Sequence, residues 1–277
     1  MNIGFIGAGK AGTSLGVYFR RHNIPVTGYA SRTMESSKEA ARVTESAVFS
    51  NINELVTDSD IIFITTSDGV IEEIAKELAN LNLERKMLCH VSGSVSSEVL
   101  KTASCKYGSA HPMMAINNRE TDLSKAFFTI EGEDETADIL QRLLTSCGNK
   151  TARIQSSKKK KYHCAASVAS NLMVGLAAMA IDMLCDCGFE KEGAMALLEP
   201  LMTGNIASVC EKGPVAALTG PLERNDIQTV KAHMDNLEGR QKEIYRLLSL
   251  ELVKLAREKH REQDYTTILS MLEEQKR

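Results

Sequence analysis

Hydrophobic residues in the first half of the chain form short continuous runs, separated by segments with helical composition. Such runs are typical of strands buried on both faces of a parallel sheet. Strands are predicted over 2–6, 25–30, 48–50, 60–65, 86–91, 107–112 and 127–130. Helices are predicted over 11–22, 36–44, 70–80 and 134–147, with a short one beginning at Asn53. This alternation predicts an α/β fold with a doubly wound parallel sheet of the Rossmann type.

The pattern changes after about Arg153. The following segment is rich in alanine and methionine and contains no strand-like run. Helices are predicted over 158–187, 191–201, 205–212, 227–237 and 239–258, and a last one from Asp264, whose charged end over 273–277 is expected to be solvated. We therefore expect a dinucleotide-binding Rossmann domain over residues 1–153 and an all-helical domain over 154–277 that contacts substrate and dimerises.

Composition narrows the function classes. The chain has 277 residues, 43% of them hydrophobic, and a net charge of −3, so nucleic acid is not an expected partner. We see no apolar run of about 18 residues and no basic segment before the first strand, so neither a membrane span nor a signal peptide is expected. The seven cysteines follow no framework spacing, which fits a reducing cytoplasm. Cys185 and Cys187 have no second pair at metal spacing, so we expect them to pack on a helix and predict no metal site.

The first strand is followed directly by a glycine turn, Gly7-Ala-Gly9-Lys-Ala-Gly12, and then by a helix and a second strand. Gly7 permits a tight turn, Gly9 lets a pyrophosphate approach the backbone, and Gly12 lets the helix pack closely on the strand. The helix N-terminus then offers N–H groups to phosphate. We therefore predict a dinucleotide site here, with Lys10 and Ala11 also in contact with the cofactor.

The end of the second strand distinguishes the two nicotinamide cofactors. NAD-binding proteins usually carry an acidic residue there, which holds the ribose 2′-hydroxyl. This chain has Ser31 and Arg32 instead, and both can donate hydrogen bonds to a phosphate. These residues favour NADP(H), although Arg32 can equally be a solvated loop residue.

Other polar residues follow predicted strands at the same edge of the sheet. In a parallel sheet, ligands bind beyond the carboxyl ends of the strands, so these residues are expected to converge on one crevice. Those assigned to cofactor contacts are Thr65, Thr66, Ser67 and Ser92. Ser94 is expected to contact substrate. His111, which precedes Pro112, is expected to touch the nicotinamide or the substrate, or to be a structural histidine.

The first helix of the second half carries His163, Ser167 and Asn171 at intervals of four residues, which places them along one face. Three polar side chains on an apolar helix need partners, so they either bond within a helical core or face a cleft. In the second case His163, or a nearby lysine, protonates a carbonyl oxygen while Asn171 and Ser167 orient the substrate. The lysines of 158–161 are expected to be solvated, although Lys159 or Lys161 can reach the site by helix geometry.

A second polar cluster lies at the turn over 218–226. Arg224 is a candidate clamp for a substrate carboxylate, with Asp226 beside it. The same two residues also suit a surface pair in which Asp226 caps the next helix. His233, two turns further on, either points back at this place or is an exposed helix histidine.

These motifs together resemble a known family. The shared features are the glycine turn, Ser92-Gly93-Ser94, His111-Pro112, Tyr162-His163, Ser170-Asn171, and Leu218–Pro221 followed by Arg224-x-Asp226. They are similar to the Rossmann-like reductases with a helical C-terminal domain formerly of unknown function, in the wider 6-phosphogluconate dehydrogenase-like group. The resemblance spans nearly the whole chain. It implies an NADPH-dependent homodimer that reduces a branched 2-oxo acid, because some members are regarded as alternative ketopantoate reductases of pantothenate synthesis.

The chain departs from the wider group at one important position. That group usually carries Lys-x-x-x-Asn on its catalytic helix, whereas here the matching positions are His163 and Ser167, with Asn171 one turn later. Either His163 replaces the lysine as acid, a neighbouring lysine reaches in, or the reaction differs. His-Pro-Met also resembles a segment of prephenate dehydrogenases, without the rest of their pattern.

The leading expectation is a cytoplasmic NADPH-dependent oxidoreductase that reduces ketopantoate to pantoate. The alternatives are another carbonyl or imine reductase, a reductase that uses a deazaflavin, and a non-catalytic NADP(H)-sensing dimer.

Overall fold

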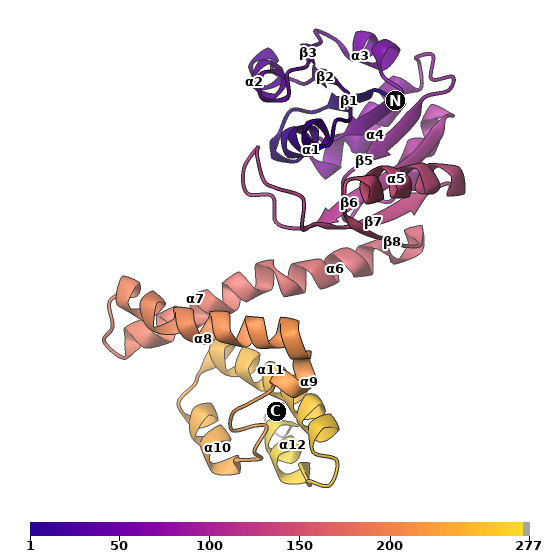
Figure 1. Cartoon of the computed structure of the whole chain (residues 1–277). Helices are drawn as coiled ribbons and strands as arrows, with labels where there is room; N and C mark the ends of the chain where they lie inside the picture. Colours follow the sequence, from indigo (N-terminus) through magenta and orange to yellow (C-terminus); the bar gives the residue numbers. More distant parts are fainter. Residues whose placement is uncertain (274–277) are drawn as a thin grey trace. The chain divides into compact units, whose positions relative to one another are not determined.

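The computed structural model describes residues 1–273, and all but the first residue of the solvated end predicted over 273–277 lie outside them. The chain divides into two compact units, one over residues 1–172 and one from Met173 onward. Each unit has its own hydrophobic core, and each is described separately below (Figure 1).

The first unit contains an eight-stranded sheet in the order β3-β2-β1-β4-β5-β6-β7-β8. Its strands are β1 (Ile3–Ile6), β2 (Val26–Ala30), β3 (Ala47–Val48), β4 (Ile61–Ile64), β5 (Met87–His90), β6 (Lys106–Met113), β7 (Phe127–Gly132) and β8 (Lys150–Arg153). All neighbouring strands are parallel except β6 and β7. The predicted doubly wound Rossmann sheet is confirmed as a mostly parallel one, in which β7 and β8 run antiparallel to the other strands.

Helices cover both faces of this sheet (Figure 1). They are α1 (Lys10–Arg21), α2 (Met34–Thr44), α3 (Ile52–Asp58), α4 (Ile71–Leu78) and α5 (Asp134–Ser146). Short 3-10 turns lie at Asp68–Val70, Ser97–Ala103 and Ser156–Lys158.

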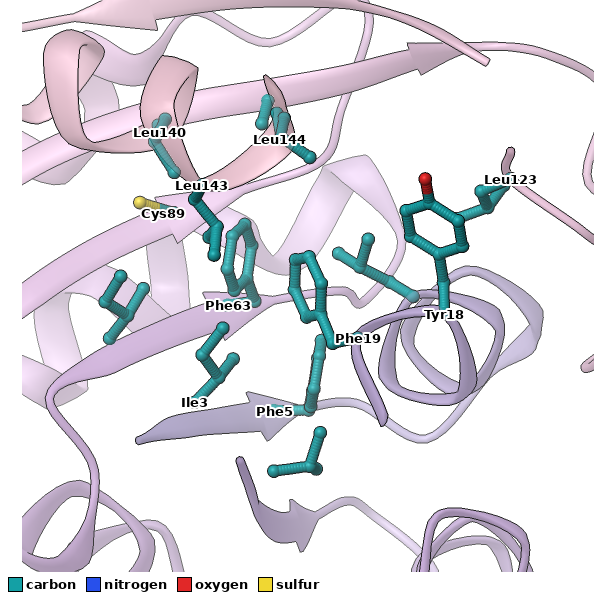
Figure 2. Packing of buried hydrophobic residues seen from close by; sticks show 14 of the residues in the cluster. Ile3, Phe5, Tyr18, Phe19, Phe63, Cys89, Leu123, Leu140, Leu143 and Leu144 are labelled. Carbon is teal, nitrogen blue, oxygen red and sulfur yellow. The ribbon is translucent and has the colours of Figure 1, made fainter. Parts of the chain in front are cut away.

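Successive residues of each central strand supply the two cores. Phe5 and Phe63 face α1 and α5, where Phe19 packs against both rings at 6.5 and 5.9 Å between centroids (Figure 2). Ile6 and Ile64 face the opposite way, into the core that includes α3 and α4. Burial on both faces explains why these strands read as continuous apolar runs.

The helix predicted over 158–187 is two helices, α6 (Lys159–Ala169) and α7 (Asn171–Asp186). Ser170 interrupts them with φ −124° and ψ −79°. Serine and asparagine compete with helical backbone bonding through their own side chains, and Ser170 and Asn171 adjoin here. The straight face expected to carry His163, Ser167 and Asn171 is therefore broken before Asn171.

The second unit is helical, as predicted. It contains most of α7, then α8 (Lys191–Lys212), α9 (Pro214–Ala217), α10 (Ile227–Asp235), α11 (Gly239–Lys259) and α12 (Thr266–Glu273). Two helices were expected over 191–212, but α8 is continuous with Pro200 inside it. The core of this unit is formed by α10, α11 and α12 around Tyr265 and Val253.

Candidate active site

The glycine turn has the geometry expected of a phosphate-binding loop. Gly7 has φ +105°, a conformation that favours glycine. Gly9 caps α1 without any side-chain cap, and a Cβ placed on it would meet nothing within 4 Å. A Cβ on Gly12 would lie 2.5 Å from the Gly7 carbonyl oxygen. The turn therefore leaves both the helix N-terminus and the space beside Gly9 open to a phosphate.

Thr65 stabilises this turn from β4. Its hydroxyl donates to the Gly7 carbonyl at 2.7 Å, and the side chain is 6% exposed. Thr65 therefore shapes the glycine turn, whereas Thr66 is half-buried and Ser67 is exposed beside it. Direct contact of Thr65, Thr66 and Ser67 with a cofactor stays a prediction.

The tip of β2 presents a free cation. Ser31 donates its hydroxyl to the Thr33 carbonyl at 2.9 Å, which folds the tip back toward α2. Arg32 is exposed and forms no ion pair or hydrogen bond with any residue in 1–273. Its guanidinium is available to bind an anion at the position where a 2′-phosphate is expected.

The loop after β5 brings Ser92, Gly93 and Ser94 to the same sheet edge. The Ser92 hydroxyl accepts hydrogen bonds from the backbone N–H groups of Ser94 and Val95, at 3.2 and 3.0 Å. Ser94 donates its own hydroxyl to Asp68 at 2.5 Å. This bond joins the loop after β5 to the loop after β4 and places a carboxylate at the edge of the site.

His111, near the end of β6, is held by a hydroxyl chain. Thr129 on β7 donates to the Tyr162 hydroxyl at 2.7 Å, and that hydroxyl lies 2.7 Å from Nδ1 of His111. Because Tyr162 accepts from Thr129, its own proton can go to Nδ1 of His111 or to Sδ of Met113 at 3.9 Å, and the thioether is the weaker acceptor. A neutral His111 then carries its hydrogen on Nε2.

His163 approaches the same point from α6. The His111 and His163 rings are 6.2 Å apart between centroids and nearly perpendicular. A Cβ on Gly93 would lie 2.7 Å from Nε2 of His111 and 2.7 Å from Nδ1 of His163. Two ring nitrogens, one from β6 and one from α6, therefore converge beside a residue that has no side chain, which makes both candidates to hydrogen-bond a substrate at this edge of the sheet.

The surroundings of His111 favour its neutral form. Burial lowers its pKa to about 4, with further lowering from Lys159 and His163 and an opposing effect of Asp68. At neutral pH the His111 imidazole is uncharged and can donate one hydrogen bond.

A layer of buried polar groups lies beneath the two histidines. Lys159, in the first turn of α6, forms an ion pair with Glu131 on β7 at 2.9 Å and donates to Ser109 on β6 at 2.5 Å. The Lys159 and Glu131 side chains are 2% and 1% exposed. Burial lowers the Lys159 pKa, and Glu131 only partly restores it. Burial raises the Glu131 pKa, but Lys159 and the donors of Ser96 and Ser97 outweigh this and leave it below its usual value.

His90, at the end of β5, completes this layer. It is fully buried, accepts a hydrogen bond from the Ser92 N–H at 3.2 Å, and has no hydrogen-bond partner in the described chain at Nε2. Burial lowers its pKa to about 3, with Lys159 as the second cause.

The remaining predicted residues either lie elsewhere in the first unit or belong to the second unit. Ser167 is half-buried on α6, and Asn171 is exposed beyond the break at Ser170. Arg224 and Asp226 lie in the second unit, where Asp226 caps α10 by accepting bonds from the Thr229 N–H and hydroxyl at 3.1 and 2.6 Å. The capping alternative for Asp226 is thus the one observed, and substrate contact by Arg224 and Asp226 stays a prediction.

His233 was a candidate to point back at Asp226, but its recorded hydrogen bond is with a residue of α11. Its Nδ1 lies 2.8 Å from the Tyr245 hydroxyl on α11.

Several residues of the site were missed or only partly foreseen from the sequence. Lys159 was one of two lysines thought able to reach the site, and Tyr162 was noted only as part of a motif. Glu131, Thr129 and Asp68 were not proposed. Glu131 had a usable signal, because it is a charged residue that directly follows the buried run Phe127–Ile130.

Neither a metal cluster nor a disulfide is found in the described chain. No group of three or more potential metal ligands occurs within 1–273, and all seven cysteines are unpaired. One helical stretch, Ser156–Asp186, is long and apolar enough to cross a membrane by length and composition alone. This corrects the expectation that no such run exists, and none of its most apolar 18-residue window is buried within the described residues.

Comparison with known families accounts for most of the chain. Residues 1–112 match the model of a Rossmann-like domain, and residues 126–252 match a domain of unknown function, DUF2520. The chain is a Rossmann-like domain joined to a DUF2520 domain. The family resemblance expected from the motifs is confirmed. No curated protein matches the chain.

Solved structures share the fold of this Rossmann-like and DUF2520 chain over nearly its full length. Protein TM1727 from Thermotoga maritima is 25% identical, with a TM-score of 0.77 over 92% of this chain and 98% of that one. A Bacteroides fragilis protein provisionally named an NADP oxidoreductase is 24% identical, with a TM-score of 0.74 over 91% and 98%. A reductive aminase from Aspergillus terreus, in complex with NADPH and ethyl-5-oxohexanoate, is 14% identical, with a TM-score of 0.64 over 98% of both chains.

Proposed function

We propose that the protein is an NADPH-dependent reductase of a small 2-oxo acid, with ketopantoate as the leading substrate and pantoate as the product. The observation that carries this proposal is the convergence of His111 and His163 over Gly93, at the sheet edge that also holds the glycine turn. The names of the Bacteroides and Aspergillus neighbours, an NADP oxidoreductase and a reductive aminase with bound NADPH, support the choice of cofactor.

The residues at this edge fit NADP(H). The uncapped N-terminus of α1 and the open space at Gly9 suit a pyrophosphate, and the free guanidinium of Arg32 suits a 2′-phosphate. When bound, the cofactor supplies the hydride.

The protein's own groups then act on the substrate carbonyl. Nε2–H of His111 donates a hydrogen bond to the oxygen, held in direction by Tyr162 and Thr129. His163, exposed to solvent on α6, delivers the proton that the oxygen needs when it becomes a hydroxyl. His163 replaces the lysine of the wider group in this scheme, while Ser167 and Asn171 are proposed to orient the substrate.

Imine reduction is a second candidate, and Asp68 favours it. Its carboxylate lies at the site edge through its bond with Ser94, whereas the nearby cation Lys159 is buried and paired with Glu131. A negative edge favours an iminium ion and disfavours a carboxylate. Replacing Asp68 by Asn is expected to raise the KM of an imine and to lower the KM of a 2-oxo acid.

We also propose that the chain is a homodimer and that it works in the cytoplasm. Exposed apolar side chains gather on α7 and α8, among them Val174 and Leu201 at 71% and 62% exposure. Such a surface is typical of a protein–protein interface, and the family resemblance of the sequence implies a homodimer.

Spectrophotometry of NADPH oxidation tests the proposed function. The panel holds ketopantoate, other branched 2-oxo acids and a cyclic imine, each with NADPH, with NADH and with a reduced deazaflavin. We expect turnover of ketopantoate with NADPH, and a fall of roughly 10²–10⁴-fold in kcat in His163→Ala. Asn171→Ala is expected to lower activity as well. Tight NADPH binding with no oxidation by any substrate would identify a non-catalytic sensing module instead.

A further inference from the structure

Polar groups of the first unit form two levels: a buried one across β5, β6, β7 and α6, and a second one across β6, β7 and α6. The buried level contains Ser109, Glu131 and Lys159, with His90 on the neighbouring strand. The register pairs His90 with Ser109 and Ser109 with Glu131, so all three lie side by side across the sheet.

The second level lies one step further along each element. On β6 the step leads from Ser109 to His111, and on the antiparallel β7 it leads from Glu131 to Thr129, which pairs with His111. Residues two apart on a strand lie on the same face. On α6 the step of four residues leads from Lys159 to His163. Each group over Gly93 therefore has a buried partner directly beneath it on the same element.

Lys159 connects the buried level to α6 through its side chain. Its ammonium reaches two strands at once, Ser109 on β6 and Glu131 on β7. Glu131 is in turn fixed by the Ser96 hydroxyl and the Ser97 N–H, both at 2.8 Å. The start of α6 is thereby tied to the two strands that carry His111 and Thr129.

We propose that Lys159 is a positioning residue: through its buried ion pair with Glu131 it fixes the first turn of α6, so that Tyr162 holds Nε2 of His111 over Gly93. This inference rests on the proposed function only for its kinetic consequence. Its structural content, one orientation and one tautomer of His111, is independent of any substrate.

The charge of Lys159, like its position, favours the neutral form of His111. It lowers the pKa of His111, as do burial and the neighbouring His163, while Asp68 opposes them. The Tyr162 hydroxyl is the remaining titratable group in contact with the His111 ring.

The test compares the full-length protein with the double variant Lys159→Met and Glu131→Gln. Removing both charges together avoids leaving one buried ion unpaired, which a single substitution does. Lys160→Met is the matched control, because Lys160 is the exposed next residue of α6.

Nitrogen-15 NMR of the His111 imidazole supplies the first readout. In the parent and in Lys160→Met we expect a single tautomer with hydrogen on Nε2. In the double variant we expect a mixture of both tautomers and a titration midpoint raised by about half a unit or more. A folded double variant with the parent tautomer and midpoint would overturn the inference.

Steady-state kinetics supply the second readout. We expect kcat of the double variant to fall by about 10–100-fold, with the KM for NADPH within about twofold of the parent, because misplacement by about 1 Å costs this much. An unchanged kcat in a folded double variant would also overturn the inference. A parent without reductase activity would refute the proposed function, and the NMR comparison would still decide the role of Lys159.

If the double variant does not fold, Ser109→Ala takes its place. It removes one of the two partners of Lys159 without changing any charge. We expect it to shift the His111 tautomer and kcat in the same direction by a smaller amount, and no shift in either would overturn the inference.

Discussion

Gly93 is the position at which a single atom decides whether the site can form. A Cβ added at this position would lie 2.7 Å from Nε2 of His111 and 2.7 Å from Nδ1 of His163. Real Cβ atoms do not approach other atoms so closely, so any side chain forces one ring to move. The sequence showed the Ser-Gly-Ser loop and both histidines, but not that the three meet. Their meeting depends on the register of β5 and β6 and on the placement of α6, which no local pattern encodes.

Gly93→Ala tests this reading directly. We expect kcat to fall by about 100-fold or more while the affinity for NADPH changes little, because the added methyl group displaces a histidine. The measurements are steady-state kinetics and fluorescence titration with NADPH. Gly69→Ala is the matched control, since a Cβ on Gly69 meets nothing within 4 Å. Equal effects of the two substitutions would contradict the account.

Arg32 is the residue on which cofactor choice depends. In Arg32→Ala we expect the KM for NADPH to rise by about 10–100-fold with little change in the KM for NADH, because only NADPH has the 2′-phosphate. Arg42→Ala is the control, because Arg42 is an exposed arginine on α2, the helix that follows the loop with Arg32. An unchanged ratio of the two KM values in Arg32→Ala would mean that the tip of β2 does not read the 2′-phosphate.

At the scale of elements, the strands buried on both faces were predictable and the others were less so. β1, β4 and β5 appear in the sequence as continuous apolar runs because both of their faces are covered. β8 was missed, because its residues Lys150–Arg153 are largely exposed at the sheet edge and lack an apolar run. The antiparallel direction of β7 was missed as well, since direction depends on the connection and leaves no periodicity.

The placement of α6 shows why the predicted boundary at residue 153 differs from the division at residue 172. The helical pattern does begin after β8, but α6 is tied to the sheet by the Lys159–Glu131 pair and by Tyr162. The composition becomes helical near residue 153. The helices stop packing on the sheet only after α6, near residue 172.

Two buried or half-buried histidines, one in the site and one beneath it, make stability depend on pH. His90 and His111 have pKa values lowered to about 3 and about 4, mainly by burial. Between these values and their ordinary pKa near 6.5, the unfolded chain binds protons that the folded chain does not, so stability falls as the pH falls.

Urea unfolding measures this effect. We expect the free energy of unfolding to drop by on the order of 3 kcal/mol for His111 alone between pH 7 and pH 4. His111→Gln is expected to flatten this slope at an unchanged m-value. A stability that is flat or rises on acidification would contradict the assigned environment of the two histidines.

At the scale of the whole molecule, the second unit leaves a large apolar surface on α7 and α8. A groove of about 340 Å³ lies there, lined by residues such as Met173, Leu198 and Met202. The composition of these helices was readable from the sequence, whereas the exposure of their apolar side chains was not. The proposed dimer would cover this surface with a second copy of the chain, without a membrane.

Leu201→Glu tests this explanation, because Leu201 is 62% exposed beside the groove. We expect multi-angle light scattering to show a dimer for the parent and a monomer for the variant at micromolar concentration, since an interface buries the new charge. Met34→Glu, on α2 of the first unit and 44% exposed, is expected to remain a dimer. A monomeric parent, or one that partitions into membranes, would contradict the proposal.

The most direct measurement follows the hydride itself. The protein is incubated with ketopantoate and NADPH that carries deuterium at C4 of the nicotinamide, with each face labelled in turn, and the product is analysed by mass spectrometry and NMR. The account predicts pantoate with deuterium at C2 from one of the two labelled cofactors, and its loss in His163→Ala. If the protein binds NADPH but transfers no deuterium to any 2-oxo acid or imine, the catalytic account of the site is contradicted.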